Sequence, residues 1–231
     1  MTNAYEVESG DARLDCLVWT PAPSKTLGAG VVFCHGWGGG AQYDDLLARL
    51  AEEGYVALRL SQRGYGKSTG RADLSRWAED MAACAKSLRS AMDVQKIWAA
   101  GQSTGGTMSL VAAATQDVFA GAVAIAAFTD LTSILQDNRN ARKILEDRFG
   151  PLQDKHFHAA DAAAMVENLK KPVLIVHGSA DETVPFSHGE ILYNKMRSNA
   201  THRGIPGGNH HLNNGDRAAV IDGILAWLKS H

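Results

Sequence analysis

Short apolar runs alternate along this chain with segments whose apolar residues recur at helical spacing. The strand-like runs cover residues 13–20, 30–34, 55–60, 97–100, 121–127, 173–176 and 202–205, and the helix-like segments cover residues 43–53, 107–114, 190–197 and 218–228, with a further helix within 74–91. In the first of these helices, Leu46, Leu47 and Leu50 lie at helical spacing, and Gly54 ends the helix before the next strand. This alternation predicts an α/β fold: a doubly wound, mostly parallel sheet covered by helices on both faces.

One stretch, residues 128–171, interrupts the alternation. It separates two predicted strands by more residues than a simple crossover uses. Its apolar positions include Leu131, Leu135, Ile144, Leu145 and Phe149, and a helix is expected to begin at the cap residue Asp161. Two interpretations stand equally: a small helical insertion over the carboxyl edge of the sheet, or a segment of which only part rises above the sheet while the rest is the crossover helix. Both interpretations are compatible with a single domain, residues 1–231. We expect 128–171 to form a small helical insertion, or lid, after the sixth strand.

Composition narrows the function classes. With 231 residues the chain can bury a sizeable core, and its formal net charge of −2, with scattered lysines and arginines, argues against nucleic-acid partners. The cysteines Cys16, Cys34 and Cys84 have no paired spacing, so we expect free thiols in a reducing compartment. Neither a secretory signal nor an apolar run near the ~20 residues of a membrane span is visible, which predicts a cytoplasmic protein without a membrane span. The oligomeric state stays open.

Ser103 lies within a Gly-Gln-Ser-Thr-Gly pentapeptide between a predicted strand and a predicted helix. Glycines two residues before and after a serine let the chain turn sharply and expose the hydroxyl. The same pattern occurs in ordinary turns, and it is the strand-to-helix position that favours a nucleophile. A serine hydroxyl reacts poorly at neutral pH, so it requires a base in contact and an acid that orients the base.

Candidates for the acid and the base follow later in the chain, in the order expected on a sheet of this class. Asp181 comes after the strand 173–176, at the sheet edge where parallel strands bind ligands. Glu182 is the neighbouring alternative, and Asp130 is less favoured. His210 follows a Pro-Gly-Gly-Asn loop and is the expected base. The adjacent His211 leaves an ambiguity that the pattern does not resolve.

Two pairs of histidines also raise the question of a metal site. One pair is His210 and His211, and the other is His156 and His158 within the stretch 128–171. The chain offers no histidines spaced i, i+4 and no cysteine cluster that would complete a metal site. We therefore predict no metal and no other cofactor, and interpret His156 and His158 as surface residues.

A hydrolytic serine also needs donors for the negative oxygen of a tetrahedral intermediate. The N–H of Thr104, directly after the serine and at the start of a helix, is one expected donor. The second is expected from the glycine-rich loop at residues 35–40, where the N–H of Trp37 is our choice. Because Gly38, Gly39 and Gly40 offer no side chains, the loop predicts an open, fairly unselective cleft with Trp37 as one wall.

Taken together, these segments resemble the α/β-hydrolase fold superfamily and, within it, compact serine esterases of the carboxylesterase or feruloyl-esterase kind. The resemblance is carried by residues 35–40, 63–68 and 101–105 with Asp181 and His210, and so spans nearly the whole chain. It implies a sheet of the α/β-hydrolase type with a short helical insertion. It also implies that residues 63–68 form a structural loop, so that Arg63 and Lys67 carry no chemistry, and it favours His210 over His211.

The function expected from these residues is hydrolysis of carboxylic esters through an acyl-enzyme intermediate with a Ser103, His210 and Asp181 triad, acting on a small-molecule ester. Thioesters or small amides would use the same groups. An alternative of another class is an NADP-binding oxidoreductase, because residues 36–41 match a glycine fingerprint after a strand. That match is weak alone and leaves the triad residues unexplained. A binding protein that has lost catalysis ranks last, because no triad member is missing.

Overall fold

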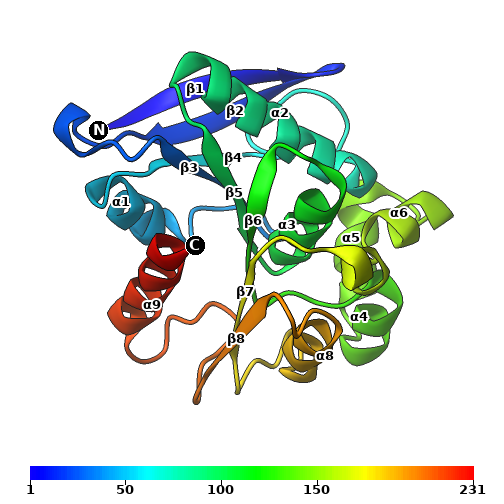
Figure 1. Cartoon of the computed structure of the whole chain (residues 1–231). Coiled ribbons are helices and arrows are strands. Elements are labelled where there is room, and N and C mark those ends of the chain that lie inside the picture. Colours follow the sequence, from blue (N-terminus) through cyan, green and yellow to red (C-terminus); the bar gives the residue numbers. More distant parts are fainter.

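The computed structural model describes all residues, 1–231, and is built around one eight-stranded sheet (Figure 1). The strands are β1 (Thr2–Ser9), β2 (Ala12–Trp19), β3 (Ala29–Cys34), β4 (Val56–Leu60), β5 (Lys96–Gln102), β6 (Phe119–Ile125), β7 (Val173–Gly178) and β8 (Ala200–Ile205). Their order across the sheet is β1-β2-β4-β3-β5-β6-β7-β8. β2 pairs antiparallel with β1 and β4, and all other neighbours are parallel. The predicted α/β class with a mostly parallel sheet is confirmed.

Helices cover both faces of this sheet, and Figure 1 shows α1 and α9 on one side with α3 and α8 on the other. The α-helices are α1 (Asp44–Glu52), α2 (Trp77–Ala91), α3 (Thr104–Thr115), α4 (Leu131–Asp137), α5 (Ala141–Phe149), α6 (Asp154–Ala159), α7 (Ala162–Met165), α8 (Ser187–Lys195) and α9 (Arg217–Ser230). Short 3-10 helices are η1 (Pro23–Lys25), η2 (Leu74–Arg76) and η3 (Val166–Asn168). No helix combines the length and the apolar character that crossing a membrane would require.

The sheet separates two hydrophobic cores, and the alternation of side chains along each strand assigns residues to one or the other. In β3, Val31 and Phe33 pack into the core beneath α1 and α9, whereas Val32 and Cys34 pack into the larger core beneath α2 and α3. Because both faces are buried, these strands appear in the sequence as continuous apolar runs rather than alternating ones. This is why the central strands could be predicted from hydrophobicity alone.

The edge strand β1 was not predicted, and the reason is its exposure. Along Thr2–Ser9 only Val7 and Ser9 are buried, so the segment shows almost no apolar pattern. It is ordered by its antiparallel ladder with β2, in which Thr2 pairs with Trp19 and Ser9 with Ala12. The predicted strand at 121–127 is shifted, because β6 ends at Ile125 and the next residue, Ala126, bends the chain with a φ of 49°.

The segment 128–171 contains four short α-helices and the 3-10 helix η3, and its parts have two different environments. The α4–α5 turn reaches the carboxyl edge of the sheet, where Asn138, Asn140 and Ile144 border a cleft described below. Farther along, α7 lies against α3 and α8, in the place of a crossover helix. Asp161 caps α7 as expected, since its carboxylate accepts a hydrogen bond from the N–H of Ala164. A lid role for the α4–α5 turn stays a prediction.

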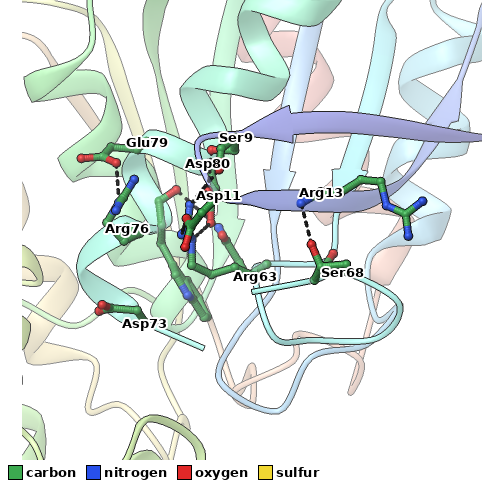
Figure 2. A network of polar contacts seen from close by, with 12 residues as sticks. Ser9, Asp11, Arg13, Arg63, Ser68, Asp73, Arg76, Glu79 and Asp80 are labelled. Atoms are coloured by element: carbon green, nitrogen blue, oxygen red, sulfur yellow. Dashed lines mark hydrogen bonds and ion pairs between the residues drawn. The ribbon is translucent and has the colours of Figure 1, made fainter. Parts of the chain in front are cut away.

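A buried ion pair fixes the loop between β4 and α2. Arg63, which is 3% exposed, donates from Nε and Nη2 to the two carboxylate oxygens of Asp80 at 2.9 and 2.6 Å. The hydroxyl of Ser9 donates to the same carboxylate at 2.7 Å, and Nη1 of Arg63 donates to Asp11 at 3.0 Å (Figure 2). These bonds join the loop to the end of β1 and to α2. Their position matches the structural role expected for residues 63–68.

We expect Arg63→Met to lower the free energy of unfolding by about 3–5 kcal/mol, because it leaves the carboxylate of Asp80 buried without its counter-charge. Urea unfolding of the variant and the wild type measures the difference. Lys67→Met is the matched control, since Lys67 is exposed on the same loop and should change stability by no more than about 0.5 kcal/mol. Equal losses in both variants would contradict a structural role specific to the Arg63–Asp80 pair.

Candidate active site

Ser103 lies at the sharp turn between β5 and α3. Its backbone has a φ of 57° and a ψ of −123°, a conformation that costs free energy for a residue with a side chain. The flanking glycines make the turn possible, because a Cβ on Gly101 would overlap the carbonyl oxygen of Gly105, and a Cβ on Gly105 would overlap that of Cys34. Backbone segments of β3, β5 and α3 therefore meet in direct contact beneath the serine.

Asp181 and His210 are joined by a short hydrogen bond. Asp181 follows β7 and His210 follows β8, so both loops leave the same edge of the sheet as the loop that carries Ser103. Nδ1 of His210 lies 2.8 Å from Oδ2 of Asp181, and the carboxylate is fully buried while the imidazole is 12% exposed. An ionised carboxylate only accepts, so Nδ1 carries the proton and Nε2 is left free to act as a base.

The surroundings of Asp181 keep it ionised. Its Oδ1 accepts hydrogen bonds from the N–H groups of Thr183 at 2.8 Å and Val184 at 2.9 Å, and Nε2 of His177 lies 3.3 Å from Oδ2. Burial acts to raise the pKa of Asp181, but hydrogen bonds from His177 and His210 more than offset it and hold the pKa well below its ordinary value. The acid is therefore a fixed negative charge at neutral pH.

Ser103 and His210 border the same cleft without forming a hydrogen bond to each other. Oγ of Ser103 is buried and has no hydrogen-bond partner. The side chain of Gln102, next to the serine, donates to the backbone oxygen of His210 at 3.2 Å and so ties the histidine loop to the turn. Catalytic hydrogen bonds in unliganded enzymes are often long and shorten only when substrate binds. The structure thus brings Asp181 and His210 into contact and places His210 at the cleft of Ser103.

The alternative acids and base lie in other environments. The ring of His211 packs edge-on against His210 at 5.2 Å between centroids and makes no bond to the buried carboxylate. Burial lowers the pKa of His211. Glu182 is exposed, and Asp130 caps α4 by accepting from the N–H of Ser133 at 2.8 Å. Neither Glu182 nor Asp130 therefore bonds to the imidazole of His210, and His211 does not bond to Asp181.

The two amides expected to bind an oxyanion come from two loops that follow the neighbouring strands β3 and β5. Thr104 is the first residue of α3, so its N–H has no partner within the helix. Trp37 lies in the loop after β3, and its N–H donates to no backbone acceptor. This loop closely approaches Ser103, because a Cβ on Gly36 would lie 3.2 Å from the Cβ of that serine. Their role as an oxyanion site stays a prediction.

The interpretation of His156 as a surface residue is wrong. The residue is 3% exposed, its ring lies 6.3 Å from that of Phe149, and its Nδ1 accepts from the N–H of Gln153 at 3.1 Å. It therefore satisfies a free backbone donor at the start of α6 while its ring faces the core. His158, two residues later, is exposed as expected.

Sequence reasoning missed two residues that support the site. His177 ends the apolar run of β7 and is fully buried, and its position four residues before Asp181 was the available signal. Asn138 lies in the α4–α5 turn, and its side chain donates to the backbone oxygen of Thr183 at 3.2 Å. It thereby ties the segment 128–171 to the loop that carries the acid, a contact that only the folded chain shows.

A cleft of about 410 Å³ opens beside Ser103, within the ~300–1,000 Å³ common for small-molecule sites. Trp37 lines it, as expected from the sequence, and Ile144 is the other hydrophobic residue. The remaining lining residues are Gly36, Gly38, Gly39, Gln42, Gln102, Ser103, Asn138, Asn140, Thr183, His210 and His211. No Asp, Glu, Lys or Arg is among them.

Most of this chain is similar in sequence to known proteins. Residues 42–231 match the prolyl oligopeptidase family. The uncharacterized protein YfhR of Escherichia coli (strain K12) is 25% identical over 217 residues, which cover 89% of this chain and 73% of that protein. The α/β-hydrolase domain-containing protein aho-3 of Caenorhabditis elegans is 28% identical over 149 residues, or 64% of this chain and 41% of that protein.

Two solved structures show the same fold. Est1E from Butyrivibrio proteoclasticus, with ferulic acid bound, superposes with a TM-score of 0.80 at 22% identity and covers 98% of both chains. The Pyrococcus horikoshii acylaminoacyl peptidase superposes with a TM-score of 0.81 at 18% identity, covering 99% of this chain but 41% of that one. The present chain therefore spans less than half of the peptidase.

Proposed function

The chain belongs to the prolyl oligopeptidase family and has the α/β-hydrolase fold, and from this premise we propose that it cleaves carboxylic esters through an acyl-enzyme intermediate. One observation carries the proposal: the imidazole of His210, held at 2.8 Å by the buried carboxylate of Asp181, borders the cleft of a serine whose hydroxyl has no other partner. A serine hydrolase requires this combination of an oriented base and an uncommitted nucleophile.

In the proposed reaction, Oγ of Ser103 attacks the ester carbonyl while Nε2 of His210 takes its proton. The N–H groups of Trp37 and Thr104 stabilise the negative oxygen of the tetrahedral intermediate. When the intermediate collapses, His210 returns the proton to the departing alcohol and the acyl group stays on Ser103. Water then attacks the acyl carbonyl while Nε2 of His210 takes its proton, and His210 passes that proton to Oγ of Ser103 as the free acid leaves.

The role proposed for Asp181 is electrostatic and positional. Its carboxylate stabilises the imidazolium that forms on His210 and holds the ring with Nε2 facing the cleft. The lowered pKa of Asp181 supports this role, because a carboxylate with a low pKa remains ionised beside the cation instead of accepting its proton.

Peptide-bond hydrolysis is the second candidate, supported by the name of the family and by the fold shared with an acylaminoacyl peptidase. The same groups would also serve thioesters and small amides. Esters are favoured because the cleft has no charged side chain to bind a free peptide terminus. The NADP-binding oxidoreductase receives no support from the family match, and Gly36, Gly38 and Gly39 border the cleft of the serine instead.

A fluorophosphonate probe followed by peptide mass spectrometry tests the nucleophile, and we expect the adduct on the peptide that contains Ser103. Substrate class is tested with an ester and an anilide of nitrophenyl type that share one acyl group, and the ester should have the higher kcat/KM. An adduct on another residue would overturn the assignment of Ser103. An anilide cleaved as efficiently as its ester would instead overturn the preference for esters and favour hydrolysis of amide or peptide bonds.

A further inference from the structure

The cleft beside Ser103 offers free hydrogen-bonding groups from three separate segments. Gln42 precedes α1, Asn140 lies between α4 and α5, and Thr183 lies in the loop after β7. None of the three side chains makes a hydrogen bond within the protein. Small-molecule sites are usually lined mainly by apolar side chains with a few polar groups, so this lining is unusual. Gln42 and Asn140 are exposed and Thr183 is half-buried, so water satisfies these groups until a bound ligand displaces it, and the ligand must then supply their partners.

Asn140 is held in place but left unused by the fold. It is the N-cap residue of α5, a position where asparagine commonly bonds a free helix N–H, yet its side chain makes no such bond. Its φ of −89° and ψ of −15° are helical, whereas a capping residue usually has an extended backbone. The side chain of Asn138 fixes the turn, because its Oδ1 accepts from the N–H of Asn140 at 3.0 Å and its Nδ2 donates to Thr183.

Gln42 also borders the cleft, and its side chain lies against the glycine-rich loop. Gly40, with a φ of +109°, lies so close that a Cβ there would be 2.8 Å from the Gln42 amide nitrogen. The backbone at Gln42 is anchored, because its carbonyl accepts from Arg217 at 3.0 Å and Arg217 is paired with Asp45 at 2.8 Å. The carboxamide is thus positioned beside the loop expected to bind the oxyanion.

The absence of formal charge from the lining residues restricts the ligand further. A carboxylate or ammonium group bound there would lose water without gaining a counter-charge. A long alkyl chain would cover the amides of Gln42 and Asn140 and leave them unpaired, which also costs free energy. A neutral ligand with its own hydrogen-bonding groups avoids both penalties.

We propose that the substrate is a small neutral ester whose acyl or alcohol part carries hydroxyl, ether or amide groups, which bind Gln42, Asn140 and Thr183. This inference rests on the proposed ester hydrolysis and narrows it. Asn140 and Gln42 are then specificity-determining residues rather than members of the reacting triad, and esters of long-chain or charged acids are poor substrates.

Two pairs of esters, matched except for one ether oxygen in place of a methylene, test the proposal. On the acyl side the pair is 4-nitrophenyl methoxyacetate and butyrate, and on the alcohol side it is 2-methoxyethyl and n-butyl acetate. In at least one pair, Asn140→Leu or Gln42→Met should lower the ratio of kcat/KM for the ether to that for the alkyl ester by about 3- to 10-fold, the effect of one neutral hydrogen bond. Comparing variants cancels the intrinsic reactivity of the esters.

Gln136→Leu is the matched control, because Gln136 is exposed on α4 outside the cleft and its substitution should leave both ratios unchanged. The proposed substrate class would be overturned if neither Asn140→Leu nor Gln42→Met changed either ratio. It would also be overturned if Gln136→Leu changed a ratio as much as they did. Labelling of Ser103 and turnover of esters would survive that result, so the proposed function would stand. Failure of both labelling and ester turnover would instead remove the proposed function, and with it this inference.

Discussion

Ser103→Ala is expected to lower kcat for a 4-nitrophenyl ester by on the order of 10⁶-fold while leaving the protein at least as stable as the wild type. The loss of turnover follows from removal of the only group proposed to form the acyl-enzyme. Stopped assays and active-site titration of the wild type give the reference rate. A variant that keeps more than about 1% of the wild-type kcat would contradict the assignment of the nucleophile.

The stability half of this prediction comes from the buried hydroxyl. Oγ of Ser103 lacks a hydrogen-bond partner, and an unsatisfied buried polar group costs ~1–3 kcal/mol. Alanine removes that hydroxyl and keeps the Cβ, so the backbone strain at a φ of 57° is the same in both proteins. We therefore expect the free energy of unfolding to rise by about 1 kcal/mol, as measured by urea unfolding.

Ser109→Ala supplies the opposite result on the same helix. The hydroxyl of Ser109 is also buried, but it donates to the carbonyl oxygen of Gly106 at 2.7 Å. Its removal should lower stability by about 1 kcal/mol and leave turnover unchanged, because the residue is outside the cleft. If both substitutions lowered the free energy of unfolding and left turnover unchanged, the hydroxyl of Ser103 would be an ordinary buried group without a catalytic role.

The candidate site could be assembled from the sequence because parallel strands bring residues that are distant in the chain to one edge of the sheet. Ser103 and Asp181 follow strands whose apolar runs were visible, His210 follows the more polar strand β8, and all three strands end at the same side of the sheet. The turn that carries Ser103 was also predictable, because the glycines at 101 and 105 mark it in the sequence. The catalytic roles of Ser103, Asp181 and His210 stay predictions.

What the sequence did not predict depends on contacts between segments far apart in the chain. The choice between His210 and His211 needed the bond to Asp181, and the burial of His156 needed the packing of α6 against η2. Similarly, a cleft expected from its glycines to be unselective is lined by amide side chains such as Asn140, which the α4–α5 turn brings there. No periodicity marks such positions, because each is one polar residue in a polar loop.

Asp181→Asn is the second substitution with a large expected effect, a fall in kcat of about 10⁴-fold with little change in the fold. The N–H groups of Thr183 and Val184 both point at Oδ1, so the amide oxygen of asparagine should take that place. Its NH₂ group then faces Nδ1 of His210, which can meet it only as an acceptor. The ring must carry its proton on Nε2, and in that tautomer it cannot accept the proton of Ser103.

Glu182→Gln is the matched control for this substitution, because Glu182 is the adjacent carboxylate and is exposed. It should leave kcat within about two-fold of the wild type, because an exposed, solvated carboxylate interacts only weakly with the reacting groups. Measuring kcat for the same ester in both variants, with circular dichroism to verify the fold, separates the two carboxylates. A large loss in Glu182→Gln with turnover retained in Asp181→Asn would transfer the acid role to Glu182. A small loss in both would mean that the 2.8 Å bond to His210 does not select its tautomer.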